Sequence, residues 1–182
     1  MVYVNQLKTC CFIGDYLQFS STKANVQYPY KIELKAVFRE RIIHLIEDLS
    51  VTHFMSGMEL GIEQYAAEII LDLKKLYPQI KLEGVLPFET HAAEWFEYER
   101  DRYFSIMKRI DKETLLQYHY SKDCMRKRDL YMISKSKYII TVSHGADKRI
   151  DNLISQSQST GRVVYVMDLQ TPDIKPNIRI CR

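Results

Sequence analysis

The sequence predicts an α/β fold, in which helices cover both faces of a doubly wound, mostly parallel sheet. Three observations predict it. Short runs rich in β-branched and aromatic residues alternate with longer runs of helical periodicity. Apolar residues make up 46% of the 182 residues, which is enough for a core on each side of a sheet. Four of the six glycines lie at or just beyond the ends of predicted strands, where the loops of a parallel sheet bind ligands.

The first half of the chain predicts three strands, each followed by a helix. The strands are short apolar runs, and the helices carry apolar side chains at a spacing of three and four residues. Tyr77-Pro78 ends the second helix and Pro87 ends the third strand, because proline cannot continue either element. In chain order we expect a strand at 9–14, a helix around 34–49, a strand at 51–56, a helix at 58–76, a strand at 80–86 and a helix at 92–110.

The second half predicts a short strand and two further strands with helices between them. The run YIITV is the strongest strand pattern there, and Gly161 is a typical left-handed helix terminator. We expect a strand at 114–117, a helix at 124–136, a strand at 138–142, a helix at 147–160 and a strand at 163–167. The segment 169–182 holds two prolines and is expected to be a peripheral tail, so the core of a single domain covering 1–182 lies at about 9–168.

Composition excludes some classes of protein and predicts no metal or cofactor. The 26 basic and 23 acidic residues give a net charge of +3, too balanced for a dedicated nucleic-acid or membrane-surface binder. No leader and no apolar stretch of membrane-spanning length is seen, which predicts a cytoplasmic protein. The four cysteines and five histidines show no metal-ligand spacing.

The glycines indicate where a ligand would bind. Gly14, Gly57, Gly61 and Gly145 all lie at or just after the carboxyl ends of predicted strands. In a parallel sheet these ends share one rim, where helix N-termini and backbone amides face a ligand. We therefore expect these four glycines to converge on a single crevice.

The stretch SGMELGIEQ, residues 56–64, allows two interpretations. Ser56 and Glu59 have the spacing of a capping box, a purely structural helix start, and this is the favoured role of Ser56. Gly61 inside a helix calls for a reason, which helix–sheet packing supplies as easily as a ligand does. Alternatively, Glu59 and Glu63 accept hydrogen bonds from ligand hydroxyl groups, which carboxylates favour and a phosphate would not.

Five sequence blocks together resemble the YpsA-like branch of the SLOG superfamily. They are TCCFIG, SGMELGIEQYAAEIILDLK, VLPFE, the pattern Y-x-x-x-CM-x-x-R-x-x-YM at 120–132, and YIITV. That superfamily also includes the LOG phosphoribohydrolases and the DprA/SMF DNA-processing proteins. The resemblance implies a Rossmann-like fold and a site for a nucleotide or a nucleotide-derived ligand.

The resemblance also implies individual site residues. Gly14 matches the first family turn, although Asp15 and Tyr16 replace its usual His-Arg pair. Among the other positions that correspond to the family blocks, the implied site residues are Ser56, Gly57, Gly61, Glu63 (where the family usually has Asp), Gln64 and Arg128. After the fourth main strand the family usually has a Gly-Gly-Thr phosphate turn, of which only Gly145 remains. Phosphate therefore binds differently in this chain or does not bind.

Two further candidates come from position alone. Glu89 follows Pro87 at the end of the third strand and is a candidate for the same crevice, with an exposed loop acid as the equal alternative. Arg100, on the predicted helix at 92–110, and Arg128 are candidate partners for an anion. For Arg100 the favoured alternative is an ordinary solvated helix face.

These features predict a sensor or regulatory protein that binds a nucleotide-derived small molecule, rather than an efficient enzyme. The first alternative is a LOG-like N-glycosidase that cleaves nucleoside monophosphates, with a glutamate stabilising the oxocarbenium-like centre. The second, weaker alternative is a DprA-like DNA-binding module, which requires a basic and aromatic groove. We expect no membrane partner, and the aromatic helix at 92–110 leaves room for a homodimer.

Overall fold

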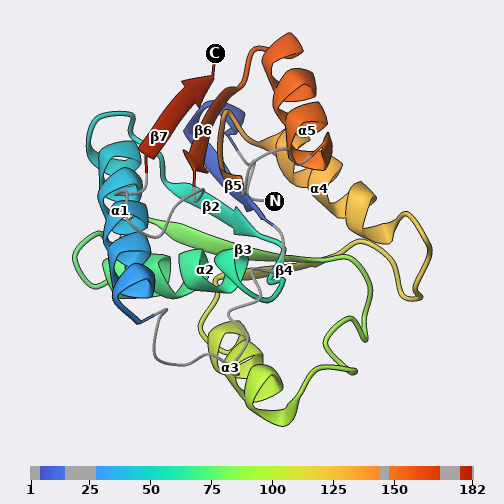
Figure 1. The fold of residues 1–182 in the computed structure, drawn as a ribbon. Coiled ribbons are helices and arrows are strands. Elements are labelled where there is room, and N and C mark those ends of the chain that lie inside the picture. The colour runs from blue at the N-terminus through green and yellow to red at the C-terminus, as the bar shows by residue number, and fades with distance from the viewer. Residues whose placement is uncertain (1–4, 15–27, 144–147, 169–176, 182) are drawn as a thin grey trace.

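The computed structural model describes residues 5–14, 28–143, 148–168 and 177–181, which form a layered α/β structure (Figure 1). The strands are β1 (Thr9–Ile13), β2 (His53–Ser56), β3 (Lys81–Leu86), β4 (Lys112–Leu115), β5 (Tyr138–Ser143), β6 (Val163–Asp168) and β7 (Asn177–Cys181). The helices are a short 3-10 turn, η1 (Gln6–Lys8), and α1 (Tyr28–Glu47), α2 (Ile62–Leu73), α3 (Glu97–Met107), α4 (Cys124–Lys135) and α5 (Lys148–Ser159). Most of the predicted elements are present in the predicted order.

The seven strands form one sheet in the order β4-β3-β2-β1-β5-β6-β7. Every pair is parallel except β6 with β7. The chain builds outward from β1 to β4 and then returns to place β5 on the other side of β1, so the direction of winding reverses between β1 and β5. In open α/β sheets the crevice at the carboxyl ends of such a pair is the usual ligand site.

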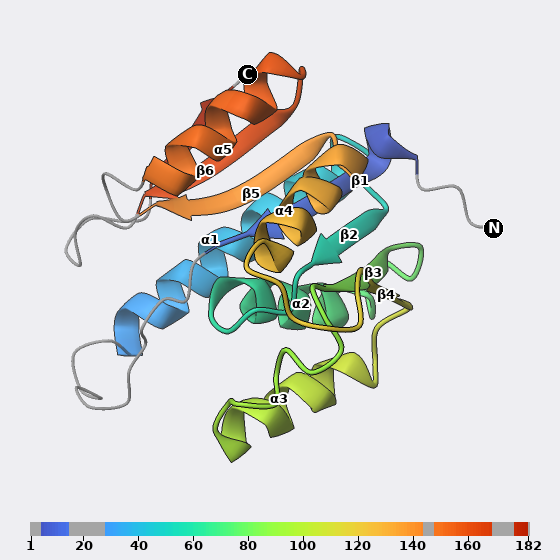
Figure 2. The same cartoon turned by 90° about the vertical axis from the view of Figure 1, so that its right-hand side faces the viewer.

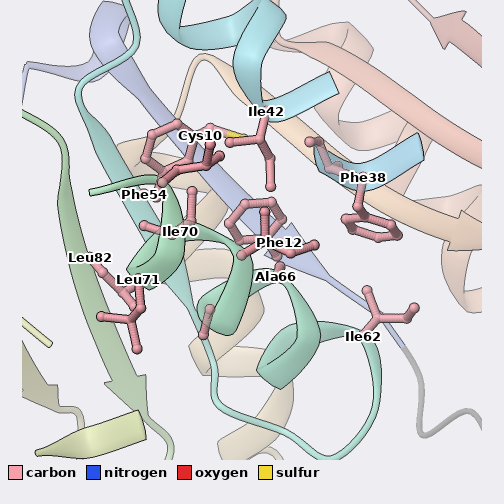
Figure 3. Close-up of a cluster of buried hydrophobic side chains, with 14 of the residues drawn as sticks. Cys10, Phe12, Phe38, Ile42, Phe54, Ile62, Ala66, Ile70, Leu71 and Leu82 are labelled. Atoms are coloured by element: carbon pink, nitrogen blue, oxygen red, sulfur yellow. The ribbon is translucent and has the colours of Figure 1, made fainter. Parts of the chain in front are cut away.

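Helices cover both faces of the sheet, which confirms the doubly wound, Rossmann-like prediction. Figure 2 shows α4 and α5 on one face and α1 and α2 on the other. Successive strand residues point to opposite faces. Cys10, Phe12 and Phe54 pack with α1 and α2 in the larger cluster, part of which is drawn in Figure 3, while Cys11 and Met55 pack with α4 and α5.

The start of α2 differs from the prediction. The capping box between Ser56 and Glu59 is absent, because the helix begins at Ile62 and Glu59 lies before it. Ser56 is fully buried, and its hydroxyl accepts a hydrogen bond from Met58 N–H and donates one to the Glu63 carbonyl. Gly61 precedes the helix with φ +94°, a backbone conformation that residues with side chains disfavour, so the backbone requires glycine at this position.

Other elements also differ from the prediction: α1 begins at Tyr28 rather than around residue 34, α2 ends at Leu73 rather than at 76, and β4 covers Lys112–Leu115 rather than 114–117. Helix α3 begins at Glu97, five residues later than predicted, and Glu99 Oε2 accepts a hydrogen bond from Phe96 N–H at 3.1 Å, which fixes this start. The tail contributes β7, which pairs antiparallel with β6 at one edge of the sheet. Within the described residues, no helix is both long and apolar enough to cross a membrane.

Candidate functional site

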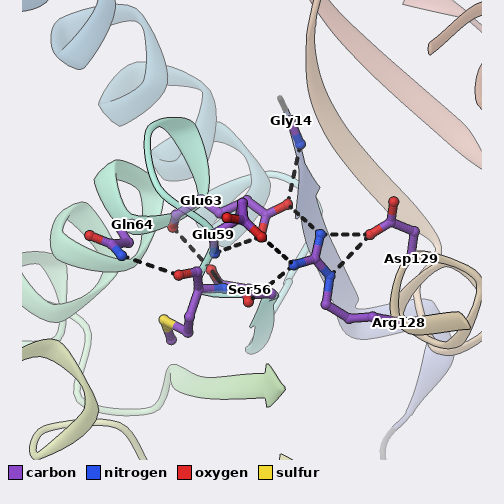
Figure 4. Close-up of polar contacts among 9 residues, drawn as sticks. Gly14, Ser56, Glu59, Glu63, Gln64, Arg128 and Asp129 are labelled. Carbon is purple, nitrogen blue, oxygen red and sulfur yellow. Dashed lines mark hydrogen bonds and ion pairs between the residues drawn. The ribbon is translucent and has the colours of Figure 1, made fainter. Parts of the chain in front are cut away.

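The candidate site lies where β1 and β2 end beside the start of α2. Phe12 pairs with Ser56 and Ile13 pairs with Thr141, so the carboxyl ends of β1, β2 and β5 are neighbours. We call the residues that meet here the rim cluster; they are Gly14, Ser56, Gly57, Glu59, Glu63, Gln64, Arg128 and Asp129. Figure 4 labels all of them except Gly57. The structure thus brings most of the predicted site residues together.

Glu63 is the centre of this cluster. It is the second residue of α2, and only 1% of it is exposed. Its Oε1 accepts a hydrogen bond from Gly14 N–H at 3.3 Å, and its Oε2 accepts one from Glu59 N–H at 3.1 Å. One buried carboxylate therefore joins the end of β1 to the loop after β2.

Arg128, on α4, completes the cluster from the opposite face of the sheet. It is also 1% exposed, and its guanidinium donates to Glu63 Oε1, Glu59 Oε2 and the Gly57 carbonyl, each at 3.4 Å. Its shortest bonds go to Asp129 Oδ1, at 2.9 and 3.1 Å. Asp129 was absent from the predicted site residues, because the sequence does not show that Arg128 is buried and brings its neighbour to the rim.

The electrostatics of the cluster are dominated by a surplus of negative charge. Three carboxylates, those of Glu59, Glu63 and Asp129, surround the single guanidinium of Arg128. Burial raises the pKa of Glu63 to about 7, against the lowering effect of Arg128. Burial alone would lower the pKa of Arg128, but the three carboxylates reverse this and raise it, so the guanidinium stays charged.

Two glycines of the rim cluster have packing reasons that the sequence did not show. A Cβ on Gly57 would lie 2.5 Å from Glu63 Oε2 and 2.6 Å from Arg128 Cζ, so this glycine makes room for the ion pair. A Cβ on Gly14 would lie 3.1 Å from Ile62 Cβ, at the first turn of α2. Any direct role of these glycines in ligand contact stays a prediction.

The loop after β2 is strained. Met58 has φ +57°, in the left-handed region that non-glycine residues seldom adopt, although its side chain is fully buried. Gln64 Nε2 donates to the Met58 carbonyl at 3.2 Å, which helps to hold this conformation. The Gln64 Oε1 atom is buried without a hydrogen-bond partner in the described structure. Backbone strain of this kind is concentrated at functional sites.

His91 is a second polar residue that the sequence did not single out. It is 8% exposed, and neither ring nitrogen has a partner among the described residues. Its ring makes edge contacts with Trp95 and Tyr103 at centroid distances of 5.1 and 5.3 Å. Burial, together with the nearby charge of Arg128, lowers its pKa to about 4, so this histidine is neutral at pH 7.

The remaining predicted residues lie elsewhere or outside the described residues. Glu89 and Arg100 line a separate pocket beside α3 and make no hydrogen bond with the rim cluster. Asp15 and Gly145 fall in segments that the structure does not describe, so their place at the rim stays a prediction. Among the described residues, no group of three or more metal-ligating side chains could hold a metal ion.

Solved structures with a similar fold include two DNA processing proteins. DNA processing protein A from Helicobacter pylori, whose structure was described for its single-stranded DNA binding mode, superposes with a TM-score of 0.54 at 15% identity. DprA from Streptococcus pneumoniae superposes with a TM-score of 0.50 at 11% identity. The superposition covers 88% of this chain in both cases but only 65% and 50% of those longer chains. At such low sequence identity, this structural similarity is evidence for the fold alone.

Curated proteins similar to this chain include two UPF0398 proteins. A UPF0398 protein from Lactobacillus acidophilus is 29% identical over 142 residues, which is 75% of this chain and 74% of that protein. A UPF0398 protein from Brevibacillus brevis is 26% identical over 151 residues, 80% of each chain. The YspA SLOG family matches residues 19–159, which include the whole of α2, α4 and the loop after β2. Because this match covers more than half of the chain, the chain belongs to the YspA SLOG family.

Proposed function

We propose that this protein binds a nucleotide-derived small molecule at the carboxyl rim of its sheet and acts as a sensor or regulator. The observation that carries the proposal is the rim cluster itself. A partly exposed carboxylate, that of Glu59, is held at the end of β2 by Arg128, beside the point where the winding of the sheet reverses. Strain at Met58 in the same loop adds support.

The charges of the cluster indicate which part of a ligand approaches it. Arg128 is buried and already surrounded by three carboxylates, so it offers little net attraction to a phosphate. Ionised carboxylates accept hydrogen bonds from hydroxyl groups. The side chain of Glu59 is 20% exposed and that of Glu63 is 1% exposed, so Glu59 is the carboxylate that contacts ribose hydroxyls. Any phosphate of the ligand lies away from the cluster.

Calorimetric titration with nucleosides, nucleotides and sugar nucleotides tests the proposal. We expect at least one of these compounds to bind, and Glu59→Gln to weaken that binding by about tenfold or more, because a charge-assisted hydrogen bond contributes about 1.5–3 kcal/mol. Glu40→Gln, which changes an exposed residue of α1, is the matched control and should leave the affinity unchanged. Absence of any ligand, or equal effects of the two variants, would refute the proposal.

The N-glycosidase alternative has one observation in its favour. The pKa of Glu63, about 7, suits a group that transfers protons near neutral pH. However, Glu63 is buried and both of its oxygens accept hydrogen bonds from the protein. Chromatographic search for free base after incubation with nucleoside monophosphates decides between binding and hydrolysis. We expect no release.

DNA binding remains the third candidate, because a structural neighbour from Helicobacter pylori binds single-stranded DNA. Binding of this kind depends steeply on salt. A gel-shift titration with single-stranded DNA at two salt concentrations separates it from small-molecule binding. We expect no salt-dependent shift with this chain.

A further inference from the structure

A second pocket lies beside α3, outside the rim cluster. Its volume is about 450 Å³, within the range of ligand-binding clefts. Tyr103 is its most buried aromatic residue, and Phe104, which is half-exposed, lines it from the same helix. The lining also includes residues of the loop between β3 and α3. This pocket therefore combines an aromatic wall with an open side.

The pocket is lined by more acidic than basic side chains. Glu89, Glu97 and Asp101 all line it, against a single cation, Arg100. Within the described residues, none of these three carboxylates makes an ion pair or a side-chain hydrogen bond, and Arg100 donates only to the Ala93 carbonyl, at 3.5 Å. Three unpaired carboxylates in one pocket attract a cation and repel an anion.

Exposed aromatic residues lie in chain segments next to the pocket lining. Phe96 and Tyr98 stack on one another at the start of α3, at a centroid distance of 6.0 Å. Near Glu89, whose N–H donates to the Tyr118 carbonyl, the ring of Tyr120 packs against that of Phe88 at a centroid distance of 5.6 Å. The four residues Phe96, Tyr98, Tyr118 and Tyr120 are between 65% and 71% exposed. Exposed aromatic residues in such density mark protein-binding surfaces rather than ordinary solvated ones.

We propose that the surface formed by this pocket and by Phe96, Tyr98, Tyr118 and Tyr120 binds a basic segment of a partner protein, with an arginine side chain entering the pocket. Guanidinium suits the pocket because its planar group pairs with carboxylates and also stacks on aromatic rings such as Phe104. The neighbouring Phe96, Tyr98, Tyr118 and Tyr120 then contact the apolar parts of the segment. A nucleic acid is the wrong occupant, because Glu89, Glu97 and Asp101 would face its phosphates.

The single tryptophan gives a direct readout of binding. Trp95 lies 5.6 Å from Tyr103, edge to face, and Tyr103 lines the pocket. The probe is an acetylated, amidated peptide of three alanine–arginine pairs, and the control peptide carries neutral citrulline in place of each arginine. We expect the arginine peptide to change the Trp95 fluorescence saturably, with weakening as salt rises from about 50 to about 300 mM. The citrulline peptide should not bind.

Paired variants locate the site. Replacing two of the pocket acids together, Glu97→Gln with Asp101→Asn, should weaken the arginine peptide about tenfold or more, whereas Glu40→Gln on α1 should not. Equal binding of both peptides, or an unchanged affinity in the double variant, would overturn the proposal. So would light scattering that shows a dimer which the double variant dissociates, because the surface would then bind a second copy. None of these measurements depends on a nucleotide ligand, so they fail independently of the rim proposal.

Discussion

Gly57→Ala is expected to be a strongly destabilising substitution, because it forces a methyl group into the centre of the rim cluster. The new Cβ would lie 2.5 Å from Glu63 Oε2 and 2.6 Å from both Cζ and Nε of Arg128. Unstrained contacts between such atoms are about 3.5–4.0 Å, so the guanidinium or the carboxylate must move by roughly 1 Å. The backbone itself tolerates alanine, because Gly57 does not have a positive φ.

The magnitude follows from what that movement breaks. The bonds from Arg128 to Glu59, Glu63 and Gly57 are 3.4 Å long, so a further displacement removes them. Overpacking alone costs about 1–3 kcal/mol, and a fully uncompensated buried charge costs about 3–5 kcal/mol. Asp129 keeps its closer bonds to Arg128, so the compensation is only partly lost. We expect a loss of about 2–4 kcal/mol in the free energy of unfolding.

Urea unfolding followed by circular dichroism measures this loss. Gly161→Ala is the matched control: Gly161 has φ +71° with no atom within 4 Å of an added Cβ, so its loss is conformational strain alone, about 1–2 kcal/mol. The double variant Gly57→Ala with Glu63→Gln should lose less than the sum of the single losses, because both changes disrupt one cluster. A loss for Gly57→Ala below that of Gly161→Ala would refute the reasoning.

Two further predictions concern other buried features. Glu83 accepts hydrogen bonds from Lys112 and Thr114 and pairs with His53. Burial opposes the charged carboxylate, but these contacts outweigh burial and lower the pKa of Glu83 to about 2. Because this folded-state pKa lies below the ordinary value of 4.5, the stabilisation is present above pH 4.5 and is lost as pH falls toward 2. Urea titrations between those pH values should show a shallower loss for Glu83→Gln than for the wild type, and parallel curves would contradict this. Gly61→Ala should lose about 1–3 kcal/mol through strain at φ +94°, measured by the same unfolding assay, and an unchanged stability would show that the loop relaxes freely.

The order of elements was predictable from the sequence because it depends on local periodicity. Strand runs such as YIITV and the helix at Cys124–Lys135 were predicted to within one residue. Boundaries failed where a tertiary contact overrides a local pattern. Ser56 and Glu59 have capping-box spacing, yet Ser56 is buried under α2 and the helix starts only after the turn at Gly61. The strand β7 was missed because Pro172 and Pro176 precede it and its pairing with β6 is not local.

The membership of the rim cluster was predictable in part, but its arrangement was not. Shared position at strand ends placed Gly14, Gly57 and Glu63 at one rim, and the structure brings them within hydrogen-bond or packing distance. The same reasoning predicted that Glu63 would face a ligand, whereas it is buried against Arg128, 65 residues away in sequence. Contacts of that separation leave no periodic signal in the sequence. The resemblance indicated both residues but not their pairing.

The Glu63–Arg128 contact limits how this rim can be transferred or shortened. Glu63 lies in the first half of the chain, and its counter-charge arrives only with α4, from the other face of the sheet. A fragment ending before Cys124 would bury Glu63 without Arg128, its cation. The first three strand–helix units therefore do not form a binding module that can be transferred on its own. Grafting this rim onto another scaffold requires both segments to be transplanted together.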